Sequence, residues 1–277
     1  MGVELLIRDG APYWYLSTEI WAVPGADPSG PQGSPVAGQA AYLWARVENT
    51  GDLDVNGVRV DFFWADPATQ VTRSNATLIG SAFADVAAGT SQEVLCLIPW
   101  IPVIVNGGHE CLVAVANHAS DSLPSPLPDA FDPPTYRQVA QRNLTVLTAG
   151  TKGMLVLTIG ALPRVDKDVR LVTEVGGELD RQTLASLGLA DLHPADQRVV
   201  EVGLHREAGC LEADEPIGEA ELRVRVPRRS SAAAYVAVRA EKLRADEYQL
   251  VRVVEMEGQD VLGGLGLVVT GVKEGEQ

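Results

Sequence analysis

Residues 41–67, AYLWARVENTGDLDVNGVRVDFFWADP, alternate between apolar and polar side chains on both sides of a turn-rich centre. Leu43, Ala45 and Val47 share one parity, whereas Trp44 and Arg46 share the other. A period of two places alternate side chains on opposite faces of a strand, and a helix would need a period near 3.6. The stretch therefore predicts two strands in the wall of a β-sandwich. The second strand either returns antiparallel to the first or crosses to the facing sheet.

The same alternation recurs in short runs along the rest of the chain, with Gly- and Pro-rich turns between them. Two Pro-rich segments, PGADPSGPQGSP and LPSPLPDAFDPP, are expected to be long loops, because proline cannot donate a hydrogen bond to a central ladder. LDRQTLASLGLADLH is the helical candidate of the second half. In it, Leu184 and Leu187 precede a predicted helix stop at Gly188.

The chain has 277 residues, which is too many for one sandwich of roughly 100 residues. The small and flexible residues TAGTKG, 148–153, follow a strand candidate that ends in NLTVL, and they predict a domain boundary. We therefore expect an all-β protein of two tandem antiparallel immunoglobulin-like β-sandwiches, residues 1–149 and 150–277, with one short helix in the second.

The first half carries the pattern L-x-A-x-V-x-N-x-G-D, then V-x-V-x-F-x-W, a strand that ends in W-x-P, and the run C-L-V-A-V. Over residues 15–147 this pattern resembles bacterial CARDB-type domains, which are cell-adhesion-related immunoglobulin-like sandwiches. The resemblance implies a sandwich with a binding or structural role, and it brings no catalytic residues. The residues that carry it are Leu43, Val47, Asn49, Gly51, Asp52, Val58, Val60, Phe62, Trp64, Trp100 and Pro102.

The net charge of −15 is spread over both halves of the chain. Phosphate backbones attract clusters of Lys and Arg, so a chain this acidic is not expected to bind nucleic acid. RVRVPRR is the strongest basic run, and the absence of interleaved aromatic residues predicts an exposed strand face. Two roles stay open for this face, protection of a sheet edge and charged docking. Its arginines are Arg223, Arg225, Arg228 and Arg229.

The sequence begins MGVELLIRDGAPYWYL, without a cationic start and a continuous apolar run. No later segment approaches the ~18 uninterrupted apolar residues of a spanning helix. We expect no membrane span and take cytoplasmic synthesis as the default, although removal of a signal would leave the same chain. The three cysteines, Cys96, Cys111 and Cys210, do not make a disulfide framework and are expected to be buried free thiols.

The segment HECLVAVANHASD places metal-ligating and hydrolytic residue types close together in sequence. His109 and Cys111 share a strand face, but His118 lies roughly 25–30 Å away at ~3.3 Å per residue. Zinc ligands must converge, so no metal site is expected. A G-x-S-x-G elbow is absent, and neighbours on one loop rarely orient a nucleophile with its base. The other residues of this candidate are Glu110, Ser120 and Asp121.

The acidic run CLEADEPIGEAE lacks the glycine that an EF-hand loop requires, so we expect a solvated loop and leave calcium binding open. Asp52 and Asp54 are interpreted in the same way. VLGGLGLVVTG lacks the spacing of a phosphate-binding loop, and its glycines are expected to bend a strand or admit another backbone. No cofactor is expected. The carboxylates of the acidic run are Glu212, Asp214, Glu215, Glu219 and Glu221.

Aromatic residues make up only 5% of the chain, yet four of them crowd into APYWYLSTEIW. Such a cluster favours a contact with a partner or with the other domain. The alternative is an edge strand that covers the first core. The four residues are Tyr13, Trp14, Tyr15 and Trp21.

Three functional hypotheses remain. The first is a non-catalytic structural or protein-interaction module, a component or accessory of a larger bacterial assembly that works by self-association or by binding a protein partner. The second is a surface adhesion or carbohydrate-binding module. The third, an enzyme, ranks lowest because no catalytic constellation withstands its structural alternative. We expect assembly to depend on salt, because screening relieves the repulsion between acidic subunits.

Overall fold

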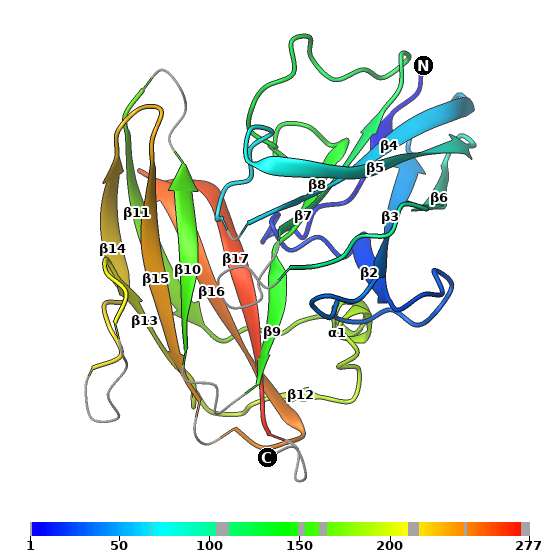
Figure 1. The fold of residues 1–277 in the computed structure, drawn as a ribbon. Coiled ribbons are helices and arrows are strands. Elements are labelled where there is room, and N and C mark those ends of the chain that lie inside the picture. Colours follow the sequence, from blue (N-terminus) through cyan, green and yellow to red (C-terminus); the bar gives the residue numbers. More distant parts are fainter. Residues whose placement is uncertain are drawn as a thin grey trace.

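Strands dominate the computed structural model, which describes residues 2–66, 68–103, 111–148, 153–160, 165–209, 216–240 and 243–272. Within these residues the strands form two β-sandwiches, and one short helix lies in the second half (Figure 1). The prediction of an all-β chain built of β-sandwiches, with one short helix in the second half, is therefore confirmed.

The first sandwich consists of two antiparallel sheets. One sheet is built on β3 (Ala41–Asn49), which pairs with β1 (Leu5–Leu6), β2 (Ile20–Pro24) and β6 (Thr90–Leu95). The other has the order β5-β4-β7-β8, formed by β5 (Ala76–Val86), β4 (Val55–Ala65), β7 (Cys111–Asn117) and β8 (Val139–Arg142). The chain therefore crosses to the facing sheet after β3.

The residues of the CARDB-like pattern hold this first sandwich together. Leu43 and Val47 point from β3 into the core, where they meet Phe62 of β4. Asn49 is fully buried, and its amide group donates to the carbonyl oxygens of Leu53 and Val86 at 2.8 and 3.3 Å. These residues therefore have a structural role, because they close the core and the turn that follows β3.

The second sandwich has one large and one small sheet. The large sheet has the order β14-β11-β16-β17-β9, and β12 (His193–Pro194) pairs with β16. The small sheet has the order β10-β15-β13. Their bounds are β9 (Leu144–Thr148), β10 (Gly153–Gly160), β11 (Lys167–Val175), β13 (Glu201–His205), β14 (Glu221–Val226), β15 (Ser231–Arg239), β16 (Glu247–Glu257) and β17 (Asp260–Thr270).

Strand β9 belongs to the large sheet of the second half. It runs parallel to β17, with Leu144 opposite Gly266 and Thr148 opposite Thr270. The predicted boundary at residues 148–153 would leave this strand within the first sandwich. Its hydrogen bonds join it to the second sandwich, so the chain enters that sandwich directly after Asn143.

The predicted helix is present as α1 (Arg181–Ser186). Asp180 is its N-cap and accepts a hydrogen bond from the Thr183 amide at 2.8 Å, which satisfies one of the free donors of the first turn. The helix ends before Gly188, whose φ of +73° is a conformation that favours glycine.

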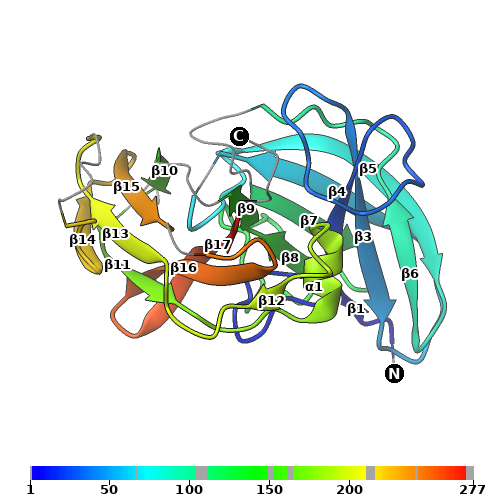
Figure 2. The ribbon, with the colours of Figure 1, turned by 90° about the horizontal axis from the view of Figure 1, so that it is seen from below.

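The two sandwiches pack together across the outer face of the large sheet, beside β9 and β17 (Figures 1 and 2). Tyr15 and Leu16 of the first half form one cluster with Tyr248 and Leu250 of β16 and with Leu184 of α1. The β16 strand is buried on both faces, because its other face lines the core of the second sandwich.

Glycines of β17 allow the first half to come this close. A Cβ atom on Gly263 would lie 2.0 Å from the carbonyl oxygen of Thr69, and one on Gly264 would lie 2.5 Å from the ring of Tyr15. The amide of Gly264 also donates to the Thr69 carbonyl at 3.0 Å. The glycines of VLGGLG thus admit another backbone, as the sequence predicted.

Buried polar groups complete the contact between the halves. The side-chain amide of Asn143 donates to the carbonyls of Ala68 at 2.8 Å and of Gly264 at 2.6 Å. Glu255 of β16 is fully buried, forms an ion pair with Lys167 at 2.6 Å, and accepts a hydrogen bond from Thr69. These bonds are directional, so they fix the register of one sandwich against the other.

Replacement of Gly263 by alanine should destabilise the protein. The new methyl group would collide with the Thr69 backbone, and overpacking of this kind costs about 1–3 kcal/mol. Gly160→Ala is the matched control, because a Cβ atom added there would meet no described atom within 4 Å. Urea unfolding should show a lower free energy of unfolding for Gly263→Ala alone, and equal values for both variants would contradict this account of the junction.

Replacement of Lys167 by methionine should cost about 3–5 kcal/mol of unfolding free energy, because it leaves the Glu255 carboxylate buried without its cation. The double variant Lys167→Met, Glu255→Leu removes both charges and should recover most of that loss. Chemical denaturation of the three proteins measures the difference. A double variant that is less stable than the single one would show that the ion pair has a different role.

Candidate interaction surface

Strand β14 is an edge strand of the large sheet and lies on the side of the second sandwich away from the first (Figures 1 and 2). Within the described part of the chain it pairs only with β11. Its burial alternates strictly, so that Leu222, Val224 and Val226 point into the core. Arg223 and Arg225 are exposed on the opposite face, as the sequence predicted for a strand with this period.

The backbone groups of the exposed residues of β14 point toward its free edge. The Ala220 carbonyl, just before the strand, accepts from the Thr173 amide of β11, whereas the Arg223 carbonyl accepts from the Arg206 guanidinium at 2.7 Å. In a strand, the N–H and C=O of one residue point to the same side, and successive residues alternate. Arg225 therefore shares the orientation of Arg223, and this edge is able to pair with another strand.

Arginines gather on the outer face beside this edge. Arg223 lies directly opposite Arg170 of β11, and Arg206 reaches the same place from the end of β13. These three side chains, with Arg225 and Met256, line a surface hollow of ≈ 590 Å³. Arg170 and Arg206 were not among the predicted residues, although the outward parity of Arg170 in KDVRLV is visible in the sequence.

The arginines of β14 are loosely paired. The side chain of Arg223 is 82% exposed and meets Glu221 at 3.6 Å, and Arg225 is 69% exposed and meets Asp166 at 3.3 Å. Exposed pairs of this kind contribute little to stability, so both arginines are available to another anion. The backbone N–H of Arg228 and the side chain of Arg225 donate to the Asp166 carboxylate and lower its pKa. Arg229, the fourth arginine of the run, lies in the turn after β14 with a φ of 60°.

The four aromatic residues of the predicted cluster lie at two places within the chain. Tyr13, Trp14 and Tyr15 pack at the contact between the sandwiches, where the Arg252 guanidinium stands 3.8 Å from the centre of the Tyr13 ring. Burial raises the pKa of the Tyr15 hydroxyl. Trp21 lies apart, stacked on Trp44 with ring centres 6.1 Å apart. Tyr15 and Trp21 are buried, so neither contributes to an exposed surface.

The loop residues considered for catalysis have structural partners. Asp121 accepts hydrogen bonds from the Leu5 amide at 2.7 Å and from Arg137 at 2.8 Å, and the His118 ring accepts from the Ser120 amide at 3.1 Å. This hydrogen bond holds the ring against a backbone N–H of its own turn. His109 and Glu110 lie outside the described residues.

The acidic candidates are also engaged or lie outside the described residues. Asp52 accepts from the Gly2 amide at 2.7 Å, and Asp54 accepts from the Ala88 amide at 2.8 Å. Each carboxylate therefore ties the turn after β3 to a distant segment of the chain. Glu219 pairs with Leu204 through the backbone, and Glu221 meets Arg170 and Arg223. Among the described residues, no group of three or more His, Cys, Asp or Glu side chains is placed to hold a metal ion. Cys210, Glu212, Asp214 and Glu215 lie outside these residues.

Two further predictions concern the cysteines and the membrane. Cys96 and Cys111 are buried, as predicted, and burial raises the pKa of the Cys96 thiol. In the part of the chain that the structure describes, no helix has the length and apolar character needed to cross a bilayer.

No family model matches this sequence, and no curated protein matches it. Among solved structures, the chain is similar to red sea bream transglutaminase, with 11% identity and a TM-score of 0.24 over 92% of this chain and 32% of that chain. It is similar to the calcium-binding domain CBD12 of CALX1.1, with 10% identity and a TM-score of 0.21 over 78% of this chain and 74% of that one. The CupB6 tip adhesin from Pseudomonas aeruginosa has 9% identity and a TM-score of 0.23, and 98% of each chain is covered. These similarities are too low to carry a functional argument.

Trp21 should behave as a core residue. Truncation to alanine removes its stack on Trp44 and should lower the free energy of unfolding by about 3–5 kcal/mol. Trp14→Ala is the comparison, and its half-buried ring should cost less. Thermal and urea unfolding measure both values. If Trp21→Ala changed association and left the unfolding transition unchanged, the ring would belong to an interaction surface after all.

Proposed function

We propose that this chain is a non-catalytic protein-interaction module, a component or accessory of a larger bacterial assembly. The observation that supports this most directly is the free edge of β14, where exposed arginines stand beside backbone groups that point away from the sheet. An edge strand of this kind is able to accept an extended segment of another chain by β-augmentation.

The charge of the edge favours an acidic partner segment. Residues 221–229, ELRVRVPRR, carry four arginines and one glutamate in a chain whose net charge is −15. Arginine forms bidentate bonds with carboxylates, which would hold acidic side chains of the incoming segment on the outer face. The acidic remainder of the surface would repel the same segment, so the charge distribution would direct it to β14.

Two further observations support an interaction role without catalysis. The resemblance of the first half to CARDB-type domains rests on residues such as Asn49 and Trp100, and these are buried. His118 and Asp121, two of the candidate catalytic residues, have backbone partners that account for their positions. We therefore propose that the chain belongs to the CARDB-type group over its first half and turns over no substrate.

The double variant Arg223→Glu, Arg225→Glu tests the proposal. Light scattering should give a mass above one chain, either for the protein alone or with the purified products of neighbouring genes. The double variant should weaken that association at least about tenfold, because both charges on the docking face are reversed. Arg59→Glu is the control, since Arg59 is an exposed arginine of the other sandwich.

The salt dependence of binding distinguishes the contribution of the arginines from that of uncharged contacts. Raising ionic strength from about 0.05 to about 0.5 M should weaken the binding of an acidic partner to the wild type more than to the double variant, since screening acts on exposed charges of opposite sign, whereas self-association of the acidic chain should increase with salt. A chain that stays monomeric at every salt concentration, binds none of these products and shows hydrolase or lyase activity would contradict the proposal.

A further inference from the structure

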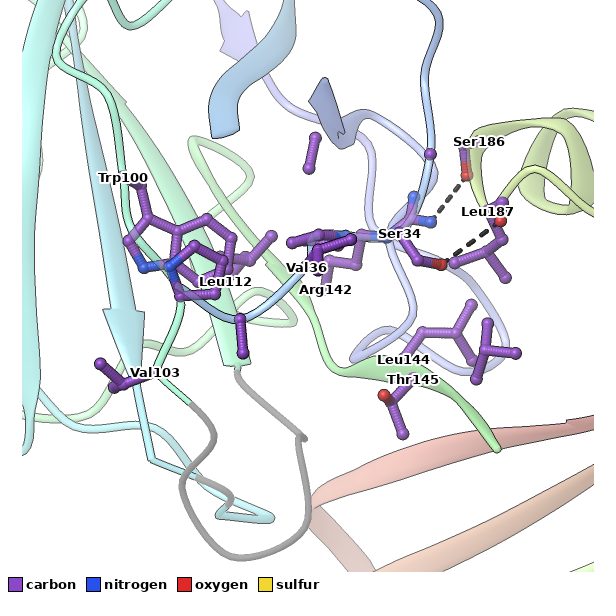
Figure 3. Close-up of a pocket in the computed structure, with 16 residues that line it drawn as sticks. Ser34, Val36, Trp100, Val103, Leu112, Arg142, Leu144, Thr145, Ser186 and Leu187 are labelled. Atoms are coloured by element: carbon purple, nitrogen blue, oxygen red, sulfur yellow. Dashed lines mark hydrogen bonds between the residues drawn. The ribbon is translucent and has the colours of Figure 1, made fainter. Parts of the chain in front are cut away.

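A cavity of ≈ 360 Å³ lies where the end of α1 meets the first sandwich. Figure 3 shows Ser186 and Leu187 of the helix end on one side, Trp100 and Leu112 of the first sandwich on the other, and Arg142 between them. The volume lies within the range of natural small-molecule sites, which begins at about 300 Å³. This cavity is distinct from the edge of β14, and none of the exposed arginines lines it.

Among the residues that the structure describes, Arg142 is a buried cation without a carboxylate partner. The residue is 5% exposed, and its guanidinium donates to the Ile20 carbonyl at 2.9 Å and to the Ser186 hydroxyl at 2.7 Å. Among the described residues, no carboxylate lies within ion-pair distance of it. A guanidinium has five N–H donors, and buried charges are ordinarily paired because the loss of hydration costs several kcal/mol.

The electrostatics of the site agree with this geometry. Desolvation lowers the pKa of Arg142 to about 10, and the more distant Asp180 only partly opposes that effect. The guanidinium therefore remains a cation near neutral pH. A bound anion would interact strongly with it, because the guanidinium is removed from water and not all of its N–H groups have acceptors within the described ranges.

The walls of the cavity combine one further donor with apolar surface. The indole N–H of Trp100 is buried, and no hydrogen-bond partner for it lies in the described part of the chain. The remaining surface is mostly aliphatic and includes Val36, Leu112 and Leu144. An inorganic anion would leave these apolar walls unused, whereas a hydrocarbon without a charge would leave Arg142 unpaired.

We propose that this cavity binds a small amphipathic carboxylate, an aliphatic acid whose carboxylate meets the Arg142 guanidinium and whose chain lies along Val36 and Leu112. At ≈ 360 Å³ the cavity holds about a dozen non-hydrogen atoms, if each takes the ~30 Å³ of a water molecule in the liquid. Because Ser186 belongs to α1 and Arg142 to β8, the ligand would lie beside a hydrogen bond that joins the two halves of the chain.

Calorimetric titration with sodium octanoate, below its micelle concentration, tests the proposal. The wild-type protein should bind it saturably with one site, and 1-octanol, which has the same chain without the charge, should bind more weakly. Arg142→Met should weaken octanoate binding roughly 10- to 100-fold, the loss expected for hydrogen bonds to a charged group. Arg59→Met, at an exposed arginine of β4, should bind as the wild type does.

A second variant tests the proposal even if Arg142→Met does not fold. Val36 lines the cavity but is 48% exposed, so Val36→Trp should fill the cavity, block octanoate and leave the unfolding transition in place. In the wild type, octanoate should shift the indole N–H resonance of Trp100, assigned through Trp100→Phe. Absence of saturable octanoate binding, equal affinity for 1-octanol, or unchanged binding by either Arg142→Met or Val36→Trp would overturn the proposal.

Discussion

The arrangement of the two sandwiches depends on one close backbone contact. The Thr69 carbonyl accepts from Gly264 and stands where a Cβ of Gly263 would be, so only glycine at these positions lets the two halves meet. Asn143 bonds to both sides of the same contact, and β9 continues directly from it into the second sheet. The place of α1 against Arg142, and hence the cavity between the halves, follows from this junction.

Local patterns were sufficient to predict the elements. The alternation in residues 41–67 corresponds to β3 and β4, and the helix signals around Leu184 and Gly188 correspond to α1 with its glycine stop. The glycines of β17 were correctly interpreted as positions of close approach, because glycine weakens the interior of a strand and commonly marks a bend or the approach of another backbone. These predictions succeed because strand period, capping and glycine conformation are properties of neighbouring residues.

The candidate sites depend on contacts between distant residues, and the sequence does not show them. Arg223 and Arg225 were predicted to be exposed, but Arg206 joins them only because β13 ends beside β14. The residues next to Arg142 in the sequence do not indicate a binding site, since the side chain is surrounded by α1 and by the loop before β3. Tyr15 was expected at a contact with a partner or with the other domain, and the pattern could not decide between them because it does not show that Gly264 leaves room for the ring.

The central claim is that the chain acts through the free edge of β14, and hydrogen exchange tests it at the backbone itself. The amides of Arg223 and Arg225 point away from the sheet, so in the isolated chain they should exchange faster than the amides of β17, which are paired on both sides. In the assembled state the account predicts that these two amides become protected while those of β17 stay as they are. Unchanged exchange in β14, together with new protection at another sheet edge such as β5 or β6, would contradict it.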